Sequence, residues 1–155
     1  MKTKITSGIH LFILLSFLLP WMTISCENKT VASLTGIDFL TGKKIESKDA
    51  FDQTETRYIP ASFYTIATAG LVVICFFLGF LRTKTALVFV GILDFTTLAL
   101  HWWFKTDLEQ KILAEGNGLF QIKPEMGFWL VTLFLFAGIG WIGFLLMQYI
   151  KNKDL

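Results

Sequence analysis

The chain has 155 residues, of which 54% are hydrophobic, and it contains 16 Phe and 5 Trp. This composition is too apolar for an ordinary soluble domain of the same length. The net charge is only +2 and the basic residues form no long run, which argues against nucleic acid as a partner. The composition therefore indicates one membrane domain over residues 1–155, with the lipid bilayer as its first partner.

Four apolar segments occupy most of the chain. A hydrocarbon core of about 30 Å is crossed by about 20 mostly apolar helical residues. On this basis the sequence predicts transmembrane helices at about 7–25, 61–82, 86–104 and 127–150. The expected fold is an all-α membrane protein, an antiparallel four-helix transmembrane bundle of tetraspan type, with outer loops at 27–60 and 105–126.

The distribution of charge predicts the orientation. The short flanks of the helices contain six Lys or Arg residues and one acid, whereas the two long loops contain eight Lys or Arg residues and ten acids. By the positive-inside rule, both termini lie in the cytoplasm and both long loops lie outside, most simply across a bacterial inner (plasma) membrane. Trp is enriched at membrane interfaces. Four tryptophans fall near the predicted outer interface: Trp21, Trp102, Trp103 and Trp129.

The first apolar segment allows a second interpretation. Its basic start and apolar run are also typical of a signal peptide, and Thr23-Ile24-Ser25-Cys26 is similar to a bacterial lipobox. Cleavage there would acylate Cys26 and leave three helices. Thr is a weak residue three places before the cysteine, so a retained first helix is the expectation and lipidation of Cys26 is the alternative.

The two outer loops are expected to form a small extracytoplasmic β-sheet. Residues 30–34, 37–40 and 43–45 are separated by turns and predict a hairpin, followed by an irregular segment at 47–57. In the second loop, Thr106 and Glu109 have the spacing of a capping box that would start a new short helix. Residues 119–123 then predict a strand, which should pair with the hairpin because a lone strand does not persist in water.

Asp94 is the acid that falls inside a predicted helix. An ionised carboxylate at the bilayer centre costs at least about 2.5–3.5 kcal/mol, so Asp94 should face the bundle interior, a watery cavity or a partner. Helical spacing places Asp94, Thr97 and His101 on one face, with Gly91 one turn before them. One interpretation is a proton or cation site with Asp94 as the titrating group and His101 as its entry. The other is a packing hydrogen bond from Asp94, either to Ser16 or to another subunit.

The remaining polar and small residues indicate packing. Cys26 and Cys75 are too far apart in the predicted topology for a disulfide, and Cys75 is interpreted as a small apolar residue. His10 is expected to reach the inner interface. Gly140 and Gly143 give the last helix a small-residue edge for close approach. The outer loops contain no histidine and no nucleophile paired with a base, so no catalytic residue, cofactor or metal site is predicted.

Several short motifs resemble a group of small bacterial four-helix membrane proteins of unknown function. These motifs are Leu19-Pro20-Trp21, Ser25-Cys26, Leu34-Thr35-Gly36, Thr41-Gly42 and Gly127-Phe128-Trp129-Leu130. The resemblance covers most of the chain and implies no activity. The layout is also similar to claudin-like tetraspan proteins, which carry strands in a large first outer loop, but the Trp and two cysteines of that loop are missing here.

The sequence thus favours a non-enzymatic membrane accessory or interaction protein that presents its outer loops to a protein partner or to a second copy of itself. The alternative is a proton- or cation-coupled transporter or channel subunit that uses Asp94, Thr97 and His101.

Overall fold

The computed structural model describes residues 2–26, 29–48, 54–81, 83–115 and 120–151. Its elements follow one another in the order α1 (Lys2–Ser16), β1 (Pro20–Cys26), β2 (Lys29–Thr35), α2 (Gly36–Thr41), β3 (Lys43–Lys48), β4 (Thr54–Ile59), α3 (Phe63–Leu78), α4 (Lys84–Glu115), β5 (Phe120–Pro124) and α5 (Met126–Lys151). Helices predominate, and the strands form small antiparallel sheets.

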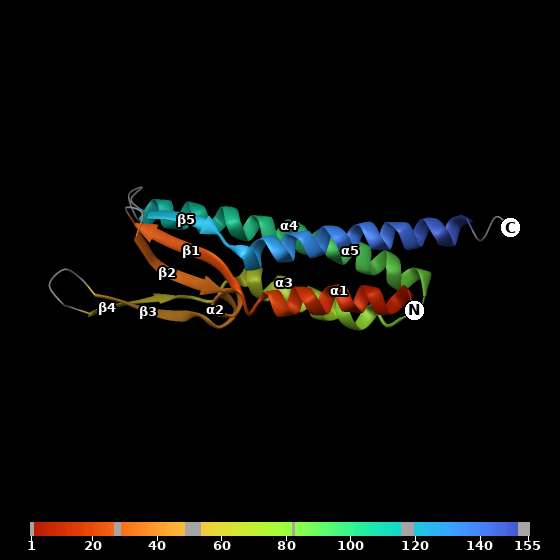
Figure 1. Cartoon of the computed structure of the whole chain (residues 1–155), viewed down its shortest axis with the longest axis horizontal. Coiled ribbons are helices and arrows are strands. Elements are labelled where there is room, and N and C mark those ends of the chain that lie inside the picture. Colours follow the sequence, from red (N-terminus) through yellow and green to blue (C-terminus); the bar gives the residue numbers. More distant parts are fainter. Residues whose placement is uncertain (1, 27–28, 49–53, 82, 116–119, 152–155) are drawn as a thin grey trace.

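The four longer helices pack side by side. α1 contacts α3 and α5, and α4 contacts the same two helices from the other side. The start of α1 and the end of α5 lie at the end of the molecule opposite the strands (Figure 1). Lys84–Ile112 in α4 and Met126–Lys151 in α5 are long and apolar enough to cross a membrane. The apolar parts of α1 and α3 are shorter, at Ile5–Ser16 and Phe63–Leu78. The prediction of a mostly helical fold with a small antiparallel sheet is therefore confirmed, and two of its helices have the length and apolar composition that crossing a membrane requires.

The helix predicted at 7–25 ends early, at Ser16. The amides of Phe17 and Leu18 donate to carbonyls three residues back, at 3.2 and 3.1 Å, which tightens the last turn. Pro20 then starts a strand, because proline has no N–H to continue the helix and it disfavours helical geometry in the residue before it. The residues that were expected to complete a membrane helix instead form β1.

β1 is the central strand of a three-stranded sheet with the order β2-β1-β5. Both pairings are antiparallel, and Ile24 lies opposite Ala32 of β2 and Ile122 of β5. The predicted strand at 119–123 is thus present from Phe120, but its partner is β1 rather than a hairpin of the first loop. The sheet therefore joins the two segments that were predicted as loops, through a strand that was predicted as part of a helix.

The hairpin predicted from 30–34, 37–40 and 43–45 is present only in part, because 30–34 lies in β2 and 43–45 lies in β3, but 37–40 lies in the helix α2. The Thr35 hydroxyl accepts a hydrogen bond from the Asp38 amide at 3.2 Å, and the Asp38 carboxylate accepts one from the Thr35 amide at 2.8 Å. This reciprocal capping satisfies two amide donors at the helix start. Partial burial raises the pKa of Asp38, but the hydrogen bonds from Lys43 and Thr35 and the charge of Lys43 outweigh it and lower the pKa.

The capping box predicted at Thr106 is also wrong. Thr106 lies inside the continuous helix α4, and its hydroxyl donates to the carbonyl of Trp102 at 3.2 Å. Two ion pairs between residues four apart stabilise this part of the helix, Lys105–Glu109 at 3.1 Å and Lys111–Asp107 at 2.7 Å. α4 therefore extends past its predicted end, and β5 lies against it.

Strands β3 and β4 form a separate two-stranded hairpin, in register from Lys43 opposite Ile59 to Lys48 opposite Thr54. The segment predicted as irregular at 47–57 forms the end of β3 and the start of β4 in its described residues, while residues 49–53 lie outside the described part of the chain. Figure 1 shows this hairpin reaching beyond the three-stranded sheet, at the end of the molecule opposite the termini.

Trp21 joins the sheet to the helices. Its side chain is completely buried, and its indole N–H donates to the Ser16 carbonyl at 2.9 Å. Gly36 and Gly127 approach it so closely that an added Cβ would lie 2.7 and 2.6 Å from its ring. The first residues of α2 and α5 are therefore packed directly against this indole.

Candidate functional site

A buried histidine–aspartate pair lies between the helices. The Nε2 atom of His10 on α1 is 2.8 Å from Oδ1 of Asp94 on α4. The two side chains are 0% and 1% exposed. The predicted partner Ser16 lies elsewhere and donates to the Phe12 carbonyl of its own helix at 2.8 Å. The predictions that His10 reaches the inner interface and that Ser16 pairs with Asp94 are therefore wrong.

The surroundings of His10 determine its tautomer. Its Nδ1 atom lies 2.8 Å from the backbone carbonyl of Thr6, and a carbonyl can only accept, so Nδ1 carries a proton. Nε2 then has either a lone pair that accepts a proton from a neutral Asp94, or a second proton that it donates to the Asp94 carboxylate. In both descriptions one proton is shared between Nε2 and Oδ1.

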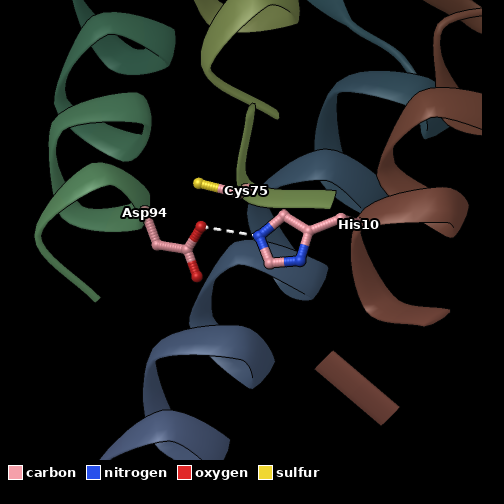
Figure 2. Close-up of side chains that lie close together, drawn as sticks. All are labelled: His10, Cys75 and Asp94. Atoms are coloured by element: carbon pink, nitrogen blue, oxygen red, sulfur yellow. Dashed lines mark hydrogen bonds and ion pairs between the residues drawn. The ribbon is translucent and has the colours of Figure 1, made fainter. Parts of the chain in front are cut away.

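Cys75 on α3 completes the cluster. One ligand atom from each of His10, Cys75 and Asp94 lies within 4.8 Å of the other two, and all three residues are buried. Figure 2 shows the Cys75 thiol and the Asp94 carboxylate on the same side of the His10 ring. The interpretation of Cys75 as a plain small apolar residue therefore omitted its two polar neighbours.

The second oxygen of Asp94 has no hydrogen-bond partner within the described part of the chain. A Cβ added at Gly138 on α5 would lie 3.1 Å from this Oδ2 atom. The small edge predicted from Gly140 and Gly143 makes no such contact, because no atom of the described residues lies within 4 Å of a Cβ at either position. Gly138 is therefore the glycine of α5 that leaves space beside the cluster.

The residues of the polar stripe predicted on α4 lie in different surroundings. The Thr97 hydroxyl donates to the Leu93 carbonyl at 2.7 Å, so it is occupied within its own helix. His101 lies 3.2 Å from the Phe128 carbonyl through Nε2, and its ring stacks on Phe128 with centroids 4.1 Å apart. It also contacts Trp21 edge-on at 5.1 Å. His101 thus belongs to an aromatic cluster, while Asp94 belongs to a cluster with His10.

Cys26, the candidate for lipidation, is the last residue of β1, where its backbone pairs with Lys29 and Phe120. Cleavage before Cys26 would remove α1 and with it His10. The histidine–aspartate pair can therefore form only in a chain that retains its first helix.

No protein-family model, curated protein or solved structure matches the chain. The candidate site therefore rests on its own geometry. Three groups that bind protons or metals come together from three different helices, and all three are buried. Buried ionisable residues with perturbing partners cluster at functional sites.

Proposed function

We propose that the chain is an integral membrane protein of the bacterial plasma membrane, with both termini in the cytoplasm, that presents its outer strands to a protein partner. In this proposal α1, α3, α4 and α5 all cross the bilayer. The β3–β4 hairpin is the part that meets the partner, which is either another protein or a second copy of the chain.

Exposed apolar side chains on the four helices support the proposal that these helices cross a membrane. Each of the four helices carries a large exposed phenylalanine: Phe12 on α1 (55%), Phe77 on α3 (64%), Phe95 on α4 (67%) and Phe136 on α5 (58%). Apolar surface of this extent is unfavourable in water but favourable in lipid. α1 and α3 fall short of about 20 residues, and a bilayer accommodates short helices by local thinning.

The proposed interaction with a partner rests on the isolated β3–β4 hairpin. Within the described residues β3 and β4 pair only with each other. A two-stranded hairpin alone is marginally stable in water, and open strand edges are templates for strand addition by another chain. Tyr58, at 61% exposure, lies on this hairpin and provides an aromatic contact.

Photo-crosslinking in intact membranes tests the interaction. A photoreactive phenylalanine replaces Tyr58, and the same probe at Lys84, at the other end of the helices, is the matched control. We expect a product heavier than the 17.6 kDa chain from position 58 only. A product of twice that mass indicates a second copy, and any other mass indicates a different partner. A properly inserted chain that gives no product at position 58 would refute the hairpin as the contact surface.

Cysteine labelling tests the topology separately. In a Cys26→Ser background, a membrane-impermeant maleimide should label Gln110→Cys in intact spheroplasts and label Lys84→Cys only after the membrane is opened. The reverse pattern, or labelling of both sites in intact cells, would contradict the proposed orientation.

The histidine–aspartate pair specifically favours a second candidate, a proton- or cation-coupled transporter or channel subunit. A buried pair that shares one proton can exchange it if the helices open, and His10, rather than His101, would share that proton with Asp94. In proteoliposomes, Asp94→Asn should abolish pH-dependent cation flux without changing insertion. If the unmodified protein produces no such flux, this candidate is wrong.

A further inference from the structure

We propose that His10, Cys75 and Asp94 form a binding site for a divalent transition-metal ion and that Zn²⁺ fits it best. The three residues come from α1, α3 and α4, so the ion would link three helices of the bundle. This inference goes beyond the interaction function and does not depend on it.

The donor set selects the metal. An imidazole nitrogen, a thiolate and a carboxylate are the ligands that Zn²⁺ uses in proteins, whereas Mg²⁺ and Ca²⁺ prefer oxygen alone. Three protein ligands and one open position are typical of a zinc site that keeps a water or takes a second carboxylate oxygen. Asp94 Oδ2, which has no partner among the described residues, is available as that oxygen.

The distances suit coordination after small movements. Metal–donor bonds of about 2.0–2.3 Å in a tetrahedron place the donor atoms about 3.3–3.7 Å apart. The ligand atoms now lie within 4.8 Å of one another, and Nε2 and Oδ1 are at 2.8 Å. An ion would therefore separate Nε2 from Oδ1 slightly and draw the Cys75 sulfur inward, while the space beside Gly138 receives the moving carboxylate.

His10 already has the orientation of a metal ligand. Histidines that bind metals generally donate their other ring N–H to a carbonyl or carboxylate, which fixes the tautomer and the ring plane. The Nδ1–Thr6 carbonyl bond of 2.8 Å does this for His10 and directs the Nε2 lone pair at the cluster. This contact is independent of the proximity of the three side chains and points to the same use of Nε2.

Charge balance also favours the ion. The site binds Zn²⁺ with loss of two protons, one from the Cys75 thiol and one shared by His10 and Asp94. The product holds one doubly charged cation, one thiolate, one carboxylate and one neutral imidazole, so its net charge is zero. A neutral assembly minimises the cost of placing charges in a medium of low dielectric constant.

Cobalt spectroscopy on the full-length protein in detergent micelles tests the site. The protein is stripped with a chelator, its helicity is checked by circular dichroism, and Co²⁺ is added at neutral pH. We expect one Co²⁺ per chain, a thiolate-to-cobalt charge-transfer band in the near ultraviolet, and loss of the band when Zn²⁺ is added.

The variants assign the ligands. Cys75→Ala should abolish the charge-transfer band, and Asp94→Asn should weaken Co²⁺ binding at least tenfold. Cys26→Ser, which removes the other cysteine, should retain both the band and the affinity. If Cys75→Ala does not fold, Asp94→Asn and Cys26→Ser still decide the question. A folded unmodified chain without the band, or a band that depends on Cys26, would overturn the proposal.

Discussion

Removal of one member of the His10–Asp94 pair should cost far more stability than removal of an exposed ion pair on the same helix. The pair is buried to 99% or more and joins α1 to α4 at 2.8 Å. Asp107 on α4 forms the matched control, because it pairs with Lys111 at 2.7 Å on a more exposed surface. The perturbations are His10→Ala, Asp94→Ala and Asp107→Ala, all measured on metal-free protein.

The expected magnitudes follow from burial. His10→Ala leaves both oxygens of Asp94 without partners in a dry interior, which costs about 2–4 kcal/mol, between the values for a neutral and a charged buried group. Asp94→Asn should cost less than about 1 kcal/mol, because the amide N–H can donate to the Nε2 lone pair. Asp107→Ala removes one surface pair within a helix and should cost about 0.5 kcal/mol or less.

The assay is reversible unfolding in mixed micelles, followed by the near-ultraviolet circular dichroism of the tryptophans. A double-mutant cycle with His10→Ala and Asp94→Ala should give a coupling energy of about 1–3 kcal/mol. Additivity of the two changes within about 0.5 kcal/mol would show that the residues do not interact. Equal losses for His10→Ala and Asp107→Ala would refute the argument from burial.

Two further variants, Gly127→Ala and Trp21→Phe, test the junction between sheet and helices, with Gly140→Ala as the control, and Asp38→Asn tests the cap of α2. Gly127→Ala places a Cβ 2.6 Å from the Trp21 ring and should lower the unfolding free energy by about 1–3 kcal/mol in the same assay. Gly140→Ala, with no described atom within 4 Å of its Cβ, should be neutral or stabilising by up to about 1 kcal/mol. Equal effects of the two substitutions would contradict the packing of Gly127 against Trp21. Trp21→Phe removes the hydrogen bond to the Ser16 carbonyl and part of the buried ring, so the unfolding free energy should fall by about 1–3 kcal/mol. An unchanged unfolding free energy would contradict the role of Trp21 at the junction. The lowered pKa of Asp38 means that its stabilisation is present above the unfolded pKa, which is near 3.8, and is lost as pH falls through the folded pKa. The stability difference between the unmodified protein and Asp38→Asn, measured by thermal unfolding, should therefore be constant from pH 7 to about pH 5 and shrink towards zero below about pH 4; a constant difference down to pH 2 would contradict the capping contact.

The lengths of the apolar runs were enough to predict two of the helices, α3 and α5. α5 (Met126–Lys151) lies where the run 127–150 placed a helix, and α3 (Phe63–Leu78) lies within the predicted 61–82. Hydrophobicity failed at 17–26, because an apolar run fits a membrane helix and a buried strand equally well. Pro20 and the β-branched Thr23 and Ile24 were the local signals for a strand, and the pairing with β5, about a hundred residues later, decides between the two.

The candidate site could be found only in part. A buried acid in a helix was visible as Asp94, but its partner depends on the rotation of α1 against α4, which no local pattern reports. His10 was assigned to an interface because it lies early in the first apolar segment. Once that segment ends at Ser16 rather than at residue 25, the same residue falls within the bundle. The error in the helix boundary therefore produced the error in the site.

The same boundary also connects the buried cluster to the three-stranded sheet. Three residues, 17–19, separate the helix that carries His10 from β1, the central strand of the sheet. The Trp21 carbonyl accepts the Glu125 amide at 2.8 Å at the start of α5, the helix that places Gly138 beside Asp94. A displacement of β1 must therefore move α1 and α5 or break contacts with Trp21. Because both ends of this connection are buried and closely packed, an ion bound between the helices would stabilise the arrangement that holds the sheet.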